Sequence, residues 1–458
     1  MKMRNCLKTF LGEVLLLFYG LVFLLLSQVE KFQGLFKWAK MRQRAQKISS
    51  PDEKLGKRTS MRNSFVPPHC LADSSLGRHM FVKIGRNKYH YVESGSQASP
   101  KVVVCLHDFA DFWYGFRHQL RSLSQNMWII ALDLKGFGDS DKPSEMSEYS
   151  MKSVVEDLRT FIELLEHERV VLMGHGLGGL IAWNLVDKYP NLIDKFITLA
   201  TPHPQTFQTR MNKNWTCMKK HRNWFLYRLP LYPERHLAQS GQDLFRDKMA
   251  RKTYTNLVTY SNMDLEAYKY SFSRKSDWTG PVSYIRNFPS HPWIPIALSG
   301  GIIQVPTLFI IGGQDTESDL ETICQSSEHV EKFAMKIVDE AGHSPHQEQP
   351  IIVNQHILRF LQDDPKNGCP TPLENTARRK SIFESLYRHS VDGVSSTMGR
   401  MSSSVTGVGS KILVSSSPQL VRSALGMPLL SKSFSLESLQ TTPEETEFPL
   451  NVRPGESF

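Results

Sequence analysis

The chain has 458 residues, 40% of them hydrophobic, which is enough to bury one large core or two ordinary ones. Its net charge of +10 comes almost wholly from residues 1–62, where 13 Lys and Arg stand against 4 acidic residues. The remainder is close to neutral, so we expect no nucleic-acid partner, because such domains carry basic charge on their folded part. The six cysteines are scattered and form no metal-binding spacing, so we expect neither a metal nor a cofactor.

Residues 1–9 form a short amino-terminal segment, and residues 10–29 are apolar except for Glu13. Twenty helical residues at about 1.5 Å each just span a bilayer core of about 30 Å, so this stretch predicts a single-pass transmembrane anchor. A cleaved signal peptide is the alternative. It is disfavoured because no small-residue cleavage site follows Leu26.

Residues 30–64 form a basic linker that includes Lys31, Lys37 and Lys40. Positive charge next to a span favours the cytosolic side, so we expect the domain to face the cytosol, on the endoplasmic reticulum. The linker is expected to contact anionic membrane lipid. The glycosylation sequon at Asn214 argues the other way, but three-residue matches often arise by chance.

Residues 65–362 alternate short apolar runs with helical patterns, which predicts an α/β domain with a mostly parallel sheet and helices on both faces. A hairpin is expected from Met80–Ile84 and Tyr89–Glu93. The following strands are expected at Val102–Leu106, Trp128–Leu132, Val170–Met173, Phe196–Ala200, Thr307–Ile311 and Met335–Val338, and helices at Ser153–Glu166, Gly178–Lys188 and Ile351–Phe360. The rhythm breaks at residues 203–300, which predict an inserted helical lid.

Residues 363–458 are rich in Ser and Thr and lack apolar periodicity. Such a segment cannot bury enough apolar surface to offset its ordering entropy, so we expect a disordered tail. The stretch Arg378-Arg379-Lys380-Ser381 suits a kinase that prefers basic residues, or a protein partner. A solvated charge cluster is an equally good interpretation.

The stretch VVLMGHGLGG at residues 170–179 has the form of a nucleophile elbow, a sharp turn between a strand and a helix. Glycine is needed there because the backbone turns tightly and neighbouring groups approach closely, and Gly174, Gly178 and Gly179 meet that need. The position of the nucleophile itself is occupied by Gly176. An ordinary glycine-rich turn is the alternative interpretation.

Three other segments support the elbow. His107 follows a strand where such folds place oxyanion-hole N–H groups, Asp315 ends the run LFIIGGQD, and His343 lies in DEAGHSPHQEQP. An acid and then a histidine, each just past a strand end and after the elbow, is the chain order of the α/β-hydrolase catalytic triad.

With these motifs the chain resembles the epoxide hydrolases of the α/β-hydrolase fold, above all their membrane-anchored animal members. The phrases that carry the resemblance are HDFADFWYGFRHQL, IIALDLKGFGDSDKP, VVLMGHGLGGLIAW, ATPHP, DLEAYKYSFS and GPVSYIRN, and it extends from about Phe65 to Leu361. The resemblance implies that an elbow aspartate attacks the epoxide to form an ester. A histidine oriented by an acid then hydrolyses the ester, and two lid tyrosines assist ring opening.

Transferred to this chain, the implied acid is Asp315 and the histidine is His343, whereas the nucleophile falls on Gly176. The lid tyrosines fall on Ile285, with Tyr284 one place earlier, and near Asn223. The family's H-G-x-P becomes His107-Asp108-Phe109-Ala110, and the oxyanion donors would be the N–H groups of Phe109 and Leu177. The pocket is expected to be lined by His107, Phe109, Trp113, Leu177, Asn223, Trp224, Tyr284 and Ile285.

These departures predict a pseudohydrolase that binds an apolar or lipid-like ligand or serves as a scaffold, because loss of the nucleophile alone can cost about 10⁶-fold in turnover. The space at Gly176 is then expected to be open. The alternative is an active hydrolase of epoxides or esters in which Asp315 and His343 activate water without a covalent nucleophile.

Overall fold

The computed structural model describes residues 14, 15, 17–28, 66–250, 260–287, 298–318 and 320–362. The predictions for the linker at 30–64 and the tail at 363–458 lie outside these residues.

An eight-stranded sheet forms the centre of the domain, with the order β1-β2-β4-β3-β5-β6-β7-β8. The first hairpin pairs antiparallel, β2 pairs antiparallel with β4, and every later pair is parallel. The strands are β1 (Arg78–Ile84), β2 (Asn87–Ser94), β3 (Val102–Leu106), β4 (Trp128–Leu132), β5 (Val170–His175), β6 (Ile193–Leu199), β7 (Thr307–Gly312) and β8 (Phe333–Val338). The predicted mostly parallel α/β sheet is confirmed.

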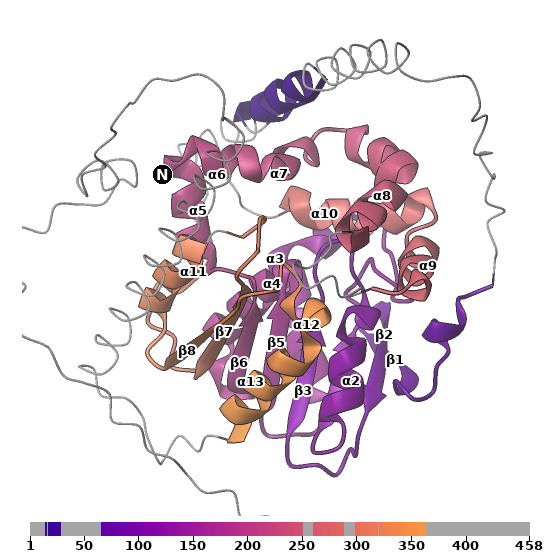
Figure 1. Ribbon diagram of the computed structural model, residues 1–458, viewed down its shortest axis with the longest axis vertical. Coiled ribbons are helices and arrows are strands. Elements are labelled where there is room, and N and C mark those ends of the chain that lie inside the picture. The colour runs from indigo at the N-terminus through magenta and orange to yellow at the C-terminus, as the bar shows by residue number, and fades with distance from the viewer. Residues whose placement is uncertain are drawn as a thin grey trace, which may run out of the picture. The chain divides into compact units, whose positions relative to one another are not determined.

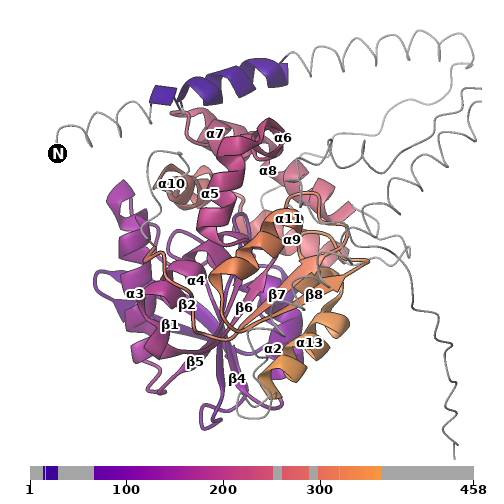
Figure 2. The same ribbon diagram turned by 90° about the vertical axis from the view of Figure 1, so that its left-hand side faces the viewer.

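Helices cover both faces of the sheet, with α3 and α4 on one side and α2, α12 and α13 on the other (Figure 2). Their apolar residues point inward, since β3, β4, β5 and β7 are buried along their whole length. The helices are α2 (Arg117–Leu123), α3 (Met151–Glu163), α4 (Gly176–Lys188), α11 (Leu320–Ser326), α12 (Pro345–Glu348) and α13 (Pro350–Gln362). Short 3-10 turns lie at His69–Leu71, Trp113–Phe116, Met146–Tyr149, Pro190–Leu192, Lys275–Trp278 and Ser327–His329.

The chain between β6 and β7 forms a group of helices that lies over one end of the sheet (Figure 1). They are α5 (Pro204–Lys213), α6 (Trp215–Lys220), α7 (Arg222–Leu226), α8 (Tyr232–Ala250), α9 (Asn262–Ser271) and α10 (Thr279–Asn287). We call them the lid. Because parallel strands place their carboxyl ends at a common edge, the lid covers the edge at which function is expected.

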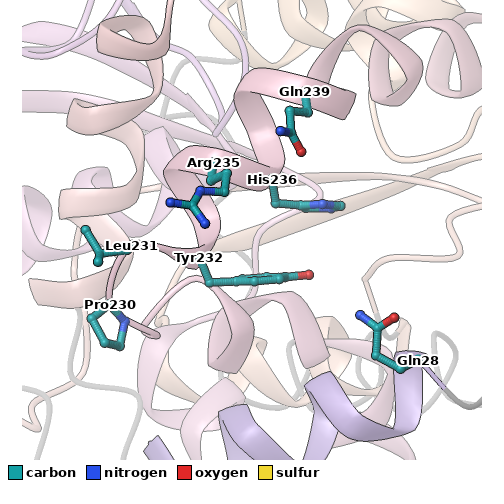
Figure 3. Close-up of a pocket in the computed structure, with 7 residues that line it drawn as sticks. All are labelled: Gln28, Pro230, Leu231, Tyr232, Arg235, His236 and Gln239. Atoms are coloured by element: carbon teal, nitrogen blue, oxygen red, sulfur yellow. The ribbon is translucent and has the colours of Figure 1, made fainter.

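In the amino-terminal segment, the described residues 17–28 are helical, and Phe23 packs against Trp215 and Phe225. Among the residues that the structure describes, no helix has the length and apolar character that a membrane crossing requires. The predicted transmembrane span is therefore not seen. Beside this segment, Gln28 and the first turns of α8 surround a shallow pocket in which Tyr232 stacks on His236 (Figure 3).

Candidate active site

Four loops meet where parallel strands end beneath the lid. The loop after β3 brings Asp108, the β5–α4 turn brings Gly176, the loop after β7 brings Asp315, and the loop after β8 brings His343. The shared strand direction explains why residues more than 200 positions apart lie in one site.

The β5–α4 turn is packed as an elbow. A β-carbon at Gly178 would lie 2.3 Å from the Leu106 carbonyl oxygen, and one at Gly179 would lie 2.4 Å from Oγ1 of Thr201. Gly176 takes a φ of +49°, a conformation that side chains rarely adopt. Close backbone approach and left-handed geometry together explain the glycines of this turn.

The space over Gly176 is filled. A β-carbon there would lie 1.8 Å from Oδ1 of Asp108, so the Asp108 carboxylate occupies the volume into which a side chain at 176 would project. The expectation of an open site is therefore wrong. Loss of the elbow side chain leaves room that the neighbouring loop fills.

His343 is held by the acid that the sequence predicts for it. Its Nδ1 lies 3.1 Å from Oδ2 of Asp315, whose other oxygen accepts from the backbone N–H groups of Glu317 (2.7 Å) and Ser318 (2.9 Å). The Ser318 hydroxyl donates to the Ala200 carbonyl at 2.7 Å. These contacts fix the acid, which in turn fixes the imidazole ring.

The other ring nitrogen of His343 faces two more carboxylates. Nε2 lies 3.5 Å from Oδ2 of Asp108 and 3.8 Å from Oε2 of Glu317. Oδ1 of Asp108 accepts from the backbone N–H of Leu177 at 2.7 Å, at the amino-terminal end of α4. One Asp108 oxygen is therefore held by a backbone donor at a positive helix end, while the other faces the imidazole.

These charges shift the proton equilibria. Burial alone would lower the pKa of His343, but the charges of Asp315 and Glu317 and the hydrogen bonds with Asp108 and Asp315 raise it well above its ordinary value. Burial would raise the pKa of Asp315, yet the His343 charge and the hydrogen bonds lower it to about 2. We therefore expect a protonated imidazole between ionised carboxylates at neutral pH in the resting protein.

The predicted oxyanion donors differ in what the structure gives them. Leu177 directs its N–H at the Asp108 carboxylate, as described. Phe109 instead contributes its ring, which stacks on Tyr227 of the lid with ring centroids 5.4 Å apart. Burial raises the pKa of the Tyr227 hydroxyl, and the Glu317 charge adds to the rise, so this phenol stays protonated.

Two predicted pocket residues have structural roles instead. His107 is fully buried; its Nδ1 donates to the Asp108 carbonyl at 2.8 Å and its Nε2 accepts from the Leu134 N–H at 3.1 Å. Trp113 is buried against His79, with ring centroids 5.1 Å apart. Both support the loop that carries Asp108.

The lid positions also need correction. Asn223 has an exposed side chain on α7, and Trp224, beside it, packs on Phe207. Ile285 is buried, and the ring of Tyr284 lies against Phe137 and Tyr149. None of these side chains supplies a hydroxyl next to Phe109, whereas Tyr227 reaches it from the end of α7.

A buried polar network ties the lid to the Asp108 loop. Tyr268 of α9 donates to Oδ1 of Asp111 at 2.7 Å, and Gln347 donates to Oδ2 at 3.1 Å. Nε of Arg117 lies 3.0 Å from Asp264, also on α9. The resemblance phrases HDFADFWYGFRHQL and DLEAYKYSFS thus meet in space, which fixes the loop relative to the lid.

Two groups of described residues bring possible metal ligands within 4.8 Å of one another: Asp108, His175 and His343, and Asp111, His175 and His346. Several of these atoms serve internal hydrogen bonds. His175 Nε2 donates to the His343 carbonyl at 2.9 Å, and Asp111 accepts from Tyr268 and Gln347. A cation would have to displace these contacts.

The sequence interpretation missed Asp108 as a site residue, along with Glu317, Ser318 and Tyr227. One signal could have revealed Asp108. Against the H-G-x-P loop and the aspartate elbow of the family, this chain has lost a carboxylate at 176 and gained one at 108.

The fold and the His343–Asp315 pair place the chain among α/β-hydrolases, and residues 101–350 match the alpha/beta hydrolase fold family. It is 32% identical over 309 residues to epoxide hydrolase 4 of Mus musculus, covering 65% of this chain and 83% of the relative. It is 30% identical over 284 residues to epoxide hydrolase 1 of Caenorhabditis elegans, covering 61% and 69%. The solved epoxide hydrolase of Bacillus megaterium aligns at 26% identity with a TM-score of 0.56, covering 62% of this chain and all of that one. The chain belongs to the epoxide hydrolase-like family of α/β-hydrolases.

Proposed function

We propose that this protein hydrolyses epoxides at the site built on His343 and Asp315. One observation carries the proposal: His343 is held between Asp315 and a second carboxylate, Asp108, over the elbow. A scaffold without chemistry has no need for a buried imidazole oriented on both sides by acids.

The arrangement supplies what hydrolysis needs. Asp315 orients the imidazole and stabilises its protonated form, so His343 can take a proton from water once its pKa falls. The Leu177 N–H stabilises negative charge on an oxygen over the elbow. The aromatic rings of Phe109 and Tyr227 border the site and suit an apolar substrate.

An aryl glycidyl ether is a suitable first substrate. The Bacillus megaterium relative is described as complexed with its product, (R)-3-[1]naphthyloxy-propane-1,2-diol, which corresponds to such an epoxide. The full chain, purified in detergent, should release the diol, measured by chromatography. His343→Ala should abolish release, and His236→Ala, at the shallow pocket on α8, is the matched control that should not.

A second candidate is a pseudohydrolase that binds an apolar or lipid-like ligand or acts as a scaffold. It is favoured by the lid, where Ile285 and Asn223 stand at the positions expected for tyrosines. In that case the full chain would release no diol, and the same epoxide would bind without reaction, as measured by calorimetry.

We propose that residues 17–28 attach the protein to a membrane, with the domain in the cytosol. The support is an apolar side of this helix that includes Phe18, Leu21 and Leu25, which are 57%, 53% and 67% exposed, opposite the buried Phe23. Flotation with vesicles should be lost on changing these three residues to Ser. In microsomes, added protease should digest the domain; protection and a glycan on Asn214 would reverse the orientation.

A further inference from the structure

We infer that Asp108, on the loop after β3, has taken over the role of the elbow nucleophile and forms the covalent ester intermediate. The inference rests on the proposed hydrolysis and assigns its attacking atom. It treats the chain as a hydrolase whose nucleophilic carboxylate has moved from the elbow to the facing loop.

The first argument is steric. The Asp108 carboxylate and a β-carbon at 176 would claim the same volume, at 1.8 Å separation. A carboxylate on either residue therefore excludes one on the other. Glycine at 176 is the condition that lets Asp108 enter the site.

The second argument is the disposition of the two carboxylate oxygens. Oδ1 accepts from the Leu177 N–H at 2.7 Å, and Oδ2 lies 3.5 Å from Nε2 of His343. A nucleophilic carboxylate needs one oxygen in an oxyanion-stabilising position and the other turned to substrate beside the base. Asp108 meets both requirements.

The third argument is that Asp108 is accessible while its supports are rigid. Its side chain is 15% exposed, against 1% for the orienting acid Asp315. The following residue, Phe109, borders the lid, and Asp111 is fixed by Tyr268 and Gln347. The loop thus presents one carboxylate to the site from a fixed base.

In the first step, Oδ2 of Asp108 attacks a ring carbon of the epoxide. The new carbon–oxygen ester bond forms as the ring carbon–oxygen bond breaks. Backside attack leaves the departing oxygen on the lid side, where it takes the proton of the Tyr227 hydroxyl. Ester formation removes the Asp108 charge and with it one cause of the high pKa of His343, which can then lose its proton to solvent.

In the second step, neutral His343 takes a proton from water as that water attacks Cγ of the ester. The negative oxygen that develops is Oδ1, which accepts from the Leu177 N–H. The bond from Cγ to the alkyl-bearing oxygen breaks, and that oxygen leaves with the new carboxyl proton as the diol. Tyr227 regains its proton through solvent, and Asp108 retains one oxygen from water.

The oxygen balance gives the test. The full chain, in excess over an aryl glycidyl ether, is allowed one turnover in water enriched in heavy oxygen, and its peptides are analysed by fragment mass spectrometry. We expect heavy oxygen in Asp108 and none in the first diol. Asp111, three residues away and buried, is an internal control that should stay unlabelled.

Variants separate this assignment from a structural role. His343→Ala should trap the ester as added mass on Asp108. Asp108→Asn should lower turnover on the order of 10⁴-fold or more and abolish the trapped ester. The exchange Asp108→Gly with Gly176→Asp should recover turnover and move the heavy oxygen to residue 176, which lost loop packing could not produce.

The outcomes distinguish the two proposals. Heavy oxygen in the diol alone, with turnover that survives Asp108→Asn but not His343→Ala, would overturn the nucleophile and leave the hydrolase. Neither diol nor ester in any form would overturn both. Ester on Asp108 without release of diol would establish the nucleophile and overturn turnover.

Discussion

Asp108 and Gly176 face each other across the carboxyl ends of β3 and β5, and only one of them can carry a side chain into the space between. The distance of 1.8 Å from a β-carbon at 176 to Oδ1 of Asp108 sets this limit. Both sites are held by backbone packing, so neither can retreat easily.

Gly176→Asp alone should therefore destabilise the protein and not restore an ordinary elbow. We expect a loss of about 1–3 kcal/mol from overpacking, with further strain from the positive φ. Adding Asp108→Gly should recover the overpacking part and leave only the strain. Urea unfolding of the single and double variants measures both; equal stability of the two would show that Asp108 moves away at no cost.

The pKa of His343 should fall when either neighbouring acid is neutralised. Because its folded pKa is raised, the imidazolium stabilises the fold fully below about pH 6.5, and this contribution is lost as the pH rises through the folded value. Asp108→Asn and Glu317→Gln should each move that loss to lower pH. Histidine NMR titration reads the shift directly, and Glu266→Gln, on an exposed pair with Lys269, should leave it unchanged.

Tyr227→Phe should reduce turnover of an aryl glycidyl ether by roughly 10²-fold, as expected for one lost hydrogen-bond donor to a developing oxyanion. The fold should be unaffected, because stacking on Phe109 needs only the ring. Tyr232→Phe on α8 is the matched control. An undiminished rate would show that water protonates the opened epoxide and that Tyr227 only packs.

Asp264→Asn should cost about 3–5 kcal/mol, because it leaves the buried Arg117 charge without its carboxylate partner. Burial would raise the pKa of Asp264, but Arg117, Ser261 and Tyr114 together lower it. Its contribution is therefore full above about pH 4 and is lost as the pH falls through the folded value. Urea unfolding at pH 7 and pH 3 should give a smaller difference at pH 3. Glu266→Gln should cost under about 1 kcal/mol at either pH.

Local pattern was enough for much of the fold. Val102–Leu106 and Trp128–Leu132 are strands over the predicted bounds, because buried parallel strands are apolar on both faces and short. The strand after Val170 runs two residues further than predicted, to His175, since the glycine of the motif does not interrupt pairing with β6. The short helix α2, Arg117–Leu123, was not expected, because its polar buried face offers no apolar period.

The sequence by itself determined the order of the triad positions and the absence of a side chain at 176, since both follow from motif spacing along one chain. Only the tertiary structure decided what stands over Gly176. Asp108 and Gly176 are 68 positions apart, and no local period relates them. They meet because β3 and β5 pair in parallel and end at one edge, so the filling of the site is a property of packing between loops.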